Sequence, residues 1–226
     1  MSELFSIQLQ NRQQQGGDGV WLDLPTTTEQ VQVALRQIGI SSDNPQGLFI
    51  SGYFAEEEKR FAISYNMVLA SNVDELNFLA SRLETLSTGE RAELNAALQA
   101  PQSELFSIGR ITDFPENVDY YVHLPDVRGP AQLGDYYLNR SGMVDMPEEW
   151  KGGIDTAQFG RYVAQQEQGA FTQYGYLVKS GDEWQKVHEG QPVPEEYRVL
   201  SFPASEILRD AANIPPPVQS TTEQQK

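Results

Sequence analysis

The chain has 226 residues with 39% hydrophobic and 10% aromatic content, so it can bury a sizeable core and is not a disordered acidic tail. It carries 32 Asp and Glu against 16 Lys and Arg, which gives a formal charge of −16. A surface this acidic repels phosphate backbones. It suits a protein that avoids nucleic acid, or one that takes the place of nucleic acid on a basic partner.

Cysteine is absent, which excludes disulfides, thiolate zinc sites and a cysteine nucleophile, and fits a reducing cytoplasm. Residues 1–15 lack the cationic start and apolar run of a signal peptide, and no apolar run approaches the length of a membrane span. We therefore expect a cytoplasmic protein that does not contact membranes.

The first 50 residues predict a small sheet. Residues 5–9 alternate like a half-buried strand, and residues 10–19 are a hairpin loop rich in Gln and Gly. Residues 21–24 and 48–50 supply two further strands.

A helix is predicted between the second and third strands. Thr26 and Glu29 have the spacing of a capping box, and Gly39 closes the helix. One face of this helix is apolar and consists of Val31, Ala34, Leu35 and Ile38.

The middle of the chain, about 65–100, predicts a helical hairpin. Ser71 or Asn72 caps its first helix, and Ser87 with Glu90 forms a capping box for the second. The apolar residues at helical spacing are Leu76, Leu79, Ala80, Leu83, Leu86, Leu94, Ala97 and Leu98.

Two more helices and several strands are predicted after residue 103. Pro130 starts a helix that reaches Gly142, and Asp155 caps a helix that ends at Gly169. The strand-like segments are 171–178, 184–187 and 197–202.

The sequence contains an internal echo, because the six residues 2–7 recur unchanged at 103–108. Each copy is followed by a strand that ends in Leu-Pro and then by a helix that stops at a glycine. This pattern indicates two related β-β-α units, at about 1–54 and 103–145. The alternative is that both are ordinary strands with similar residues.

Little of the sequence indicates catalysis. His123 and His188 lie in strand-like segments without a nucleophile or carboxylate in a known motif. Glu148, Glu149 and Asp155 could supply an acid and a base, but adjacent Glu residues after a proline are more typical of a solvated first helical turn. No phosphate-binding loop or calcium loop is present, and we expect no metal and no cofactor.

The acidic surface has a useful length scale. Duplex DNA carries one charge per about 1.7 Å, so as many carboxylates as this chain has would match roughly 54 Å of duplex. Direct nucleic-acid binding is disfavoured, because the tightest basic cluster, Lys59 and Arg60, follows three Glu.

Two groups of residues carry a resemblance to a known family. The first is Val20-Trp21-Leu22-Asp23-Leu24-Pro25 with the following helix and Leu48-Phe49-Ile50. The second is Gln132-Leu133-Gly134-Asp135-Tyr136-Tyr137-Leu138-Asn139-Arg140-Ser141-Gly142, followed by Gly153-Ile154-Asp155, Phe159-Gly160-Arg161 and Gly169-Ala170-Phe171-Thr172-Gln173-Tyr174-Gly175-Tyr176. In order and spacing they resemble the ArdA family of antirestriction proteins, over about 5–202.

The resemblance implies an elongated α+β protein in three parts, and the boundaries predicted from the residues agree with it. They are an N-terminal β-rich domain (1–64), a small helical middle domain (65–102) and a C-terminal α+β domain (103–203). A tail, 204–226, is expected to be disordered.

The resemblance further implies a non-catalytic homodimer that mimics DNA and occupies the DNA site of type I restriction–modification enzymes. The alternative is an acidic inhibitor of another nucleic-acid enzyme, such as a CRISPR effector, or of a DNA-binding regulator. A carboxylate-based hydrolase is a third hypothesis, which predicts a concave pocket at Glu148, Glu149 and Asp155. The candidate mimic acids are Asp74, Glu75, Glu84, Glu90, Glu93, Glu116, Asp119, Asp126, Asp135, Asp145, Glu148 and Glu149. The residues that resemble the antirestriction motif, expected near the dimer interface, are Leu133, Gly134, Tyr136, Tyr137, Ser141 and Gly142.

The chain departs from the family pattern where acids are usual. Ser51-Gly52 follows the third strand, Asn139-Arg140 follows the paired tyrosines, and Tyr162 replaces an aspartate. Each change removes negative charge. The mimicry is therefore expected to be weaker or directed at a different basic surface.

Overall fold

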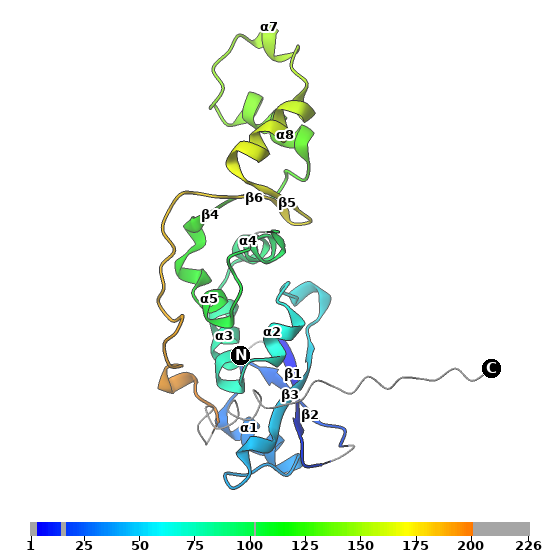
Figure 1. The fold of residues 1–226 in the computed structure, drawn as a ribbon, viewed down its shortest axis with the longest axis vertical. Coiled ribbons are helices and arrows are strands. Elements are labelled where there is room, and N and C mark those ends of the chain that lie inside the picture. Colours follow the sequence, from blue (N-terminus) through cyan, green and yellow to red (C-terminus); the bar gives the residue numbers. More distant parts are fainter. Residues whose placement is uncertain (1–3, 15–16, 102, 201–226) are drawn as a thin grey trace, which may run out of the picture.

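The computed structural model describes residues 4–14, 17–101 and 103–200. It confirms an α+β fold with two three-stranded antiparallel sheets. The molecule is elongated, with the N-terminal strands near one end and helices α7 and α8 at the other (Figure 1). The predicted tail lies outside the described residues.

The N-terminal sheet has β1 (Phe5–Asn11) in the centre, flanked by β2 (Val20–Leu24) and β3 (Leu48–Phe54). Alternation along β1 buries Ile7 and Leu9 completely, with no exposed surface on either. All three predicted strands of this region are confirmed.

Helix α1 (Thr28–Gln37) begins one residue later than predicted. The capping box consists of Thr27 and Gln30, so the predicted box of Thr26 and Glu29 is wrong. The reason is tertiary: the backbone N–H of Thr26 is buried and donates to Asn77 Oδ1 at 2.7 Å, so the next residue takes the capping position. Gly39 closes the helix as predicted, with a φ of +68°.

The two helices predicted within 65–100 are confirmed as α3 (Val73–Glu84) and α4 (Thr88–Gln99). A short helix that was not predicted, α2 (Tyr65–Leu69), precedes them. Asn72 and Glu75 form a capping box on α3, and Ser87 and Glu90 form one on α4. The apolar face of each helix packs into the core.

The C-terminal part contains the helices α5 (Ile108–Thr112), α6 (Pro130–Asp135), α7 (Glu148–Lys151) and α8 (Thr156–Glu167), with the π-helical turn η5 (Tyr136–Arg140) directly after α6. Its strands are β4 (Tyr121–Leu124), β5 (Ala170–Thr172) and β6 (Gly175–Lys179). Pro130 begins α6 and Asp155 caps α8, both as predicted. Helix α8 ends before Gln168, whose φ of 57° is left-handed, so the predicted stop at Gly169 is one residue late.

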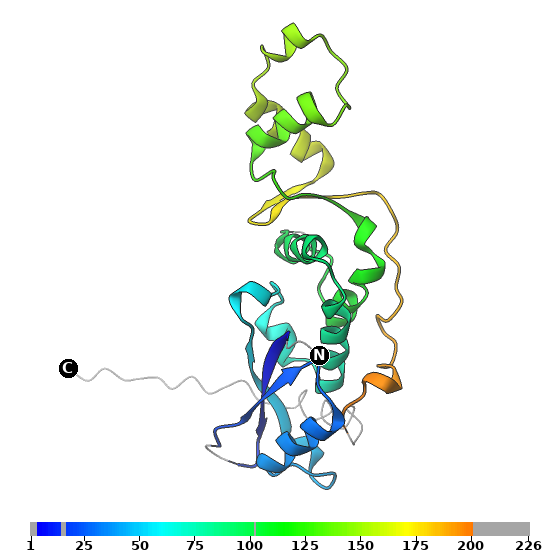
Figure 2. The same ribbon diagram turned by 180° about the vertical axis from the view of Figure 1, so that it is seen from behind.

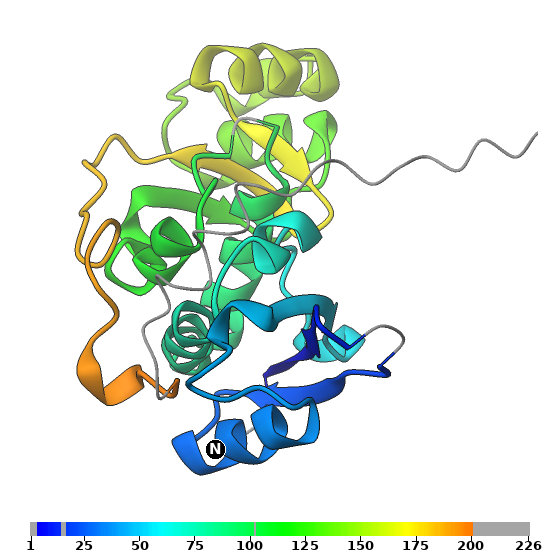
Figure 3. The same ribbon diagram turned by 60° about the horizontal axis from the view of Figure 1, so that its bottom comes forward.

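Short 3₁₀ turns connect these elements: η1 (Pro45–Gly47), η2 (Glu57–Lys59), η3 (Phe114–Glu116), η4 (Val118–Tyr120) and η6 (Glu195–Tyr197). The single strand predicted at 171–178 is wrong, because Gly175, with a φ of +132°, turns it into the β5–β6 hairpin. Segments 184–187 and 197–200 form no strand. They belong to residues 180–200, called the strap here, which runs from β6 back along the molecule to the N-terminal part (orange in Figures 2 and 3).

The sequence echo does not become a structural repeat. The described part of its first copy, residues 4–7, leads into strand β1, where Ser6 Oγ donates to Asp23 at 2.8 Å. Its second copy contains no strand, and Ser107 Oγ instead caps α5 by accepting from the Arg110 N–H at 3.2 Å. The prediction of two related β-β-α units is therefore wrong. The shared residues take different structures because the described part of the first copy pairs with a neighbouring strand, whereas the second copy lies at the start of a helix.

The protein has two hydrophobic cores of unequal size. The large core draws on all three sequence regions, and the small one, formed around Leu133 and Tyr176, lies among α6, α8 and the second sheet. That sheet, ordered β4-β6-β5, separates them: Leu177 on β6 faces the large core and its neighbour Tyr176 faces the small one. We call residues 125–169, which project beyond this sheet, the tip.

Candidate functional site

Four carboxylates surround a cleft of about 430 Å³ where η3 and η4 meet the strap. Glu116 and Asp119 come from the 3₁₀ turns, and Asp182 and Glu183 come from the strap; all four are exposed. Among the described residues, only Glu116 of these four has a cationic partner, the guanidinium of Arg82. The four acids are called the junction acids below. Folding thus gathers negative charge from segments more than sixty residues apart.

Helix α4 adds charge beside the junction acids. Glu93 is half-buried, and its Oε1 atom has no hydrogen-bond partner. Burial, and to a smaller extent the charges of Glu90 and Asp119, raises the pKa of the Glu93 carboxyl to about 7. Glu90 differs, because the hydroxyl and backbone of Ser87 hydrogen-bond to it and lower its pKa. Glu93 therefore changes charge near neutral pH while Glu90 stays ionised.

Asp74 was predicted to be a surface acid, and that prediction is wrong. Only 6% of it is exposed, and its Oδ1 accepts the backbone N–H groups of Val199 and Leu200 at 2.8 and 2.9 Å. Burial raises its pKa, although these two amides act in the opposite direction. Its neighbour Glu75 is half-buried in the α3 capping box, and Glu84 is half-buried on the last turn of the same helix.

The predicted acids of the tip are exposed or half-exposed, but some are paired locally. Asp135 forms an ion pair with Arg140 at 3.4 Å, and Glu148 pairs with Lys151 at 2.6 Å. The other members, all exposed, are Asp126, Asp145 and Glu149. The tip therefore presents less net charge than its acids suggest.

The motif-like residues build the small core. Leu133 has no exposed surface, and Gly134 lies where α6 crosses α8 so closely that an added Cβ would come within 2.0 Å of the Thr156 carbonyl oxygen. Gly160 on α8 has the same role, because its Cβ would lie 1.8 Å from the Pro130 carbonyl oxygen. These glycines permit the helix contact that encloses Leu133.

The paired tyrosines pack against the same small core of this chain. Tyr136 and Tyr137 are half-buried against it, and the hydroxyls of Tyr137 and Tyr176 both donate to the carboxylate of Glu167. Burial, followed by these contacts with Glu167, raises the pKa of both hydroxyls.

The end of the motif turns the chain. Ser141 Oγ donates to the Tyr137 carbonyl at 2.9 Å, and Gly142 adopts a φ of +70° that favours glycine. The motif therefore ends in a defined turn at the base of the exposed 143–154 loop.

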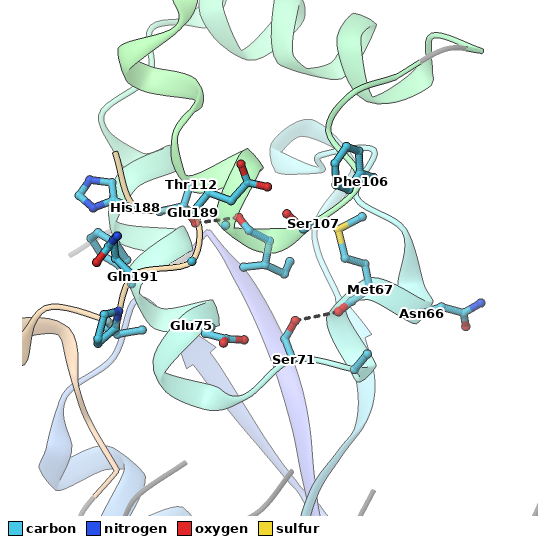
Figure 4. Close-up of a pocket in the computed structure, with 17 residues that line it drawn as sticks. Asn66, Met67, Ser71, Glu75, Phe106, Ser107, Thr112, His188, Glu189 and Gln191 are labelled. Carbon is cyan, nitrogen blue, oxygen red and sulfur yellow. Dashed lines mark hydrogen bonds between the residues drawn. The ribbon is translucent and has the colours of Figure 1, made fainter. Parts of the chain in front are cut away.

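A larger groove of about 790 Å³ lies between the strap and the α2–α3 turn. Figure 4 shows His188 and Gln191 of the strap on one side and Met67 and Phe106 on the other.

The catalytic hypothesis predicted a concave pocket at Glu148, Glu149 and Asp155, which are not among the residues that line this groove. Glu148 has 81% of its side chain exposed, and Asp155 is used in capping α8. Among the described residues, no group of three His, Cys, Asp or Glu side chains could hold a metal ion.

Sequence reasoning missed several residues of this region. Asp182, Glu183, Asp113 and Glu167 were not singled out as functional residues. No periodic pattern marks them, because the cleft that Asp182 and Glu183 line, the amides that Asp113 accepts and the Tyr137 hydroxyl that Glu167 accepts all involve residues distant in sequence. In the part of the chain that the structure covers, no helix is long and apolar enough to cross a membrane.

Comparison with known proteins identifies the family. The family model described as "Antirestriction protein (ArdA)" matches residues 17–178, more than half of the chain. A search of the curated proteins found no match. The matched region includes the middle helices, Glu116, Asp119 and the motif, but ends before the strap. The chain belongs to the ArdA family of antirestriction proteins.

Proposed function

We propose that this protein is a non-catalytic inhibitor that mimics DNA and occupies the DNA-binding groove of a type I restriction–modification enzyme in the cytoplasm. The observation that carries this proposal is the convergence of the junction acids, three of which have no cationic partner within ion-pair distance in the described part of the chain. Lys and Arg side chains that hold DNA phosphates would meet these carboxylates instead.

The proposal is tested by competition. A purified type I methyltransferase is bound to labelled duplex DNA, and the protein is titrated in at roughly 50 and 200 mM salt. We expect displacement near a stoichiometric ratio at the lower salt, and weaker displacement at the higher salt because exposed charges are screened. Failure to displace DNA at either salt, with folding verified by circular dichroism, would contradict the proposal.

A second class of target is favoured by the lack of acidic residues at Ser51-Gly52 and Asn139-Arg140, where acids are usual in the family pattern. Gly52 is buried, and an added Cβ would lie 3.0 Å from both the Gln8 side chain and the Trp21 ring, so an acid does not fit there without rearrangement. At the tip, Arg140 neutralises Asp135. If the methyltransferase keeps its DNA, the same titration is repeated with a CRISPR effector and a DNA-binding regulator. Displacement in only one of these would identify the alternative target.

We propose further that the protein is a homodimer in which the tip of one copy contacts the other. Three large side chains of the tip are exposed although they are apolar or aromatic: Met143 at 76%, Trp150 at 67% and Tyr162 at 59%. Light scattering should give twice the chain mass. The double variant Met143→Ser, Trp150→Ser should give the monomer mass, whereas the control Val33→Ser, at an exposed site on α1, should not. A double variant that stays dimeric would exclude this interface.

The three-part division at 1–64, 65–102 and 103–203 also stays a proposal. The packing is compatible with a helical middle part between two sheets, although the large core crosses both boundaries.

A further inference from the structure

The strap lies outside the region that the family model matches, residues 17–178. The match ends at residue 178, and the strap occupies 180–200. Its only helical turn is η6, and it contains no strand. It nevertheless follows a defined path beside α3 and α5. Side chains of other elements must therefore satisfy its backbone groups.

Asp113 is the first anchor of the strap. It has no exposed surface, and its carboxylate accepts three consecutive backbone N–H groups, from Val187 at 3.2 Å, His188 at 2.6 Å and Glu189 at 3.1 Å. A buried carboxylate that loses such donors is costly, because nothing else replaces its solvation. The Asp113 carboxylate thus depends on the strap for its hydrogen-bond donors, and the strap depends on the carboxylate to accept its backbone N–H groups.

Asn117 extends this anchor by one step. Its Oδ1 accepts the Gln185 N–H at 2.7 Å, and its Nδ2 donates to the Gln185 carbonyl at 3.0 Å. The side-chain amide therefore satisfies both backbone groups of Gln185, as a neighbouring strand would. Trp184 packs beside it, edge-on to Tyr120 at a centroid distance of 5.1 Å.

A second anchor holds the far end of the strap. Asp74 accepts the Val199 and Leu200 amides, and Asn77 Nδ2 donates to the Tyr197 carbonyl at 3.0 Å. Between the anchors, Phe78 packs against His188 and Tyr197, at ring-centroid distances of 4.9 and 4.6 Å. The strap is therefore fixed at both ends and along its length.

We propose that the strap is a structural tie, with Asp113 as its positioning residue, that holds Asp182 and Glu183 beside Glu116 and Asp119. The consequence for binding rests on the function proposed above. Without the Asp113 contacts, the strap acids would lie on a less restrained segment, which Asn117 and Asp74 still hold. Ordering that segment against a partner would oppose binding.

The test compares Asp113→Asn with Asp182→Asn in the full chain. Each variant removes one negative charge, but Asp182 is exposed and accepts a hydrogen bond from Ser180 of its own segment. In Asp113→Asn we expect the Val187, His188 and Glu189 amides to exchange hydrogen at least about 10-fold faster, because local opening becomes easier. Trypsin should also cut sooner at Lys186, while the β1 amides keep their protection. In Asp182→Asn the strap amides should exchange as in the wild type.

Measurements of DNA displacement distinguish a positioning role of Asp113 from an effect on folding stability alone. The Asp113→Asn variant should need roughly 5- to 10-fold more protein to displace DNA, with a shallower dependence of log affinity on log salt, because fewer acids engage the partner. A loss of folded protein would lower the active concentration without changing that slope. Asp182→Asn should cost about 2-fold, as expected for one exposed charge.

Gly109→Ala is a second variant that leaves the anchors intact. Its Cβ would lie 3.2 Å from Glu189 Cα, so it presses on the strap without removing a charge. Faster exchange of the strap amides in this variant supports the tie even if Asp113→Asn does not fold. Wild-type exchange in both variants would overturn the tie, and a released strap with undiminished displacement would overturn its role in binding. If the wild type itself displaces no DNA, the proposed function fails, whereas hydrogen exchange still decides the tie.

Discussion

The junction and the tip use the same kind of residue in opposite ways. At the junction, Glu116 and Asp119 meet Asp182 and Glu183 across a gap of more than sixty residues in sequence. Within the part of the chain that the structure describes, only Glu116 of these acids has a cation beside it. In the tip, Asp135 and Glu148 pair with cations a few residues away. The number of acidic residues in a region therefore does not determine how much net negative charge its surface presents. Ion pairs between nearby residues lower the net charge of the tip, whereas tertiary folding concentrates negative charge at the junction.

The comparison of the junction with the tip assumes that the tip folds around its own small core. The variant Gly134→Ala tests this assumption, and we expect it to have the largest effect. An added Cβ would lie 2.0 Å from the Thr156 carbonyl oxygen, so the crossing of α6 and α8 must open, at about 3 kcal/mol or more. We expect the α8 amides to lose hydrogen-exchange protection while those of β1 keep it. Gly152→Ala, with nothing within 4 Å of the added Cβ, is the matched control. Simultaneous loss of protection in both regions would show that the two cores unfold together.

The junction and tip can be compared directly by neutralising four acids in each. One variant changes Glu116, Asp119, Asp182 and Glu183 to their amides, and the other changes Asp135, Asp145, Glu148 and Glu149. Exposed ion pairs contribute about 0.2–1 kcal/mol each, so the junction variant should lose roughly 10- to 100-fold in DNA displacement. The tip variant should lose less, because Arg140 and Lys151 already pair with two of its four acids, whereas at the junction only Glu116 has a cationic partner among the described residues. Equal losses in the two variants would remove the distinction.

Glu93 makes the junction sensitive to pH. With a pKa of about 7, its carboxyl takes up a proton as pH falls from 8 to 6, so the junction loses charge and displacement should weaken about 2- to 3-fold. Folding stability has the opposite sign. A raised carboxyl pKa means that the folded state binds the proton more tightly, so this contribution to stability grows as pH falls through 7. Glu93→Gln should remove the pH dependence of displacement measured at constant ionic strength. The same dependence in the variant would assign it to another group.

A single exposed acid should have the smallest effect. Asp126→Asn removes one charge at the start of the tip, and we expect a change of less than about 2-fold in DNA displacement. The competition assay at low salt measures it most sensitively. Abolished inhibition in this variant would contradict a distributed acidic surface.

Local sequence patterns predicted much of the fold because they depend on neighbours along the chain. The predicted capping box of Ser87 and Glu90 and the stop at Gly39 were confirmed for this reason, and the cap predicted at Ser71 or Asn72 is Asn72. The strap was predicted as strands and is not, because its backbone partners are the side chains of Asp74, Asn77, Asp113 and Asn117. No periodicity in the strap itself marks such partners.

The sequence by itself determined the acidic charge, the α+β class, the middle helices and membership of the family, because composition, periodicity and motif spacing are local properties. Only the tertiary structure decided which acids are presented. It buried Asp74 and Asp113 as anchors, although sequence reasoning placed Asp74 on the surface, and it brought Asp182 beside Asp119. The physical reason is that the state of a carboxylate depends on burial and on donors that arrive from distant segments.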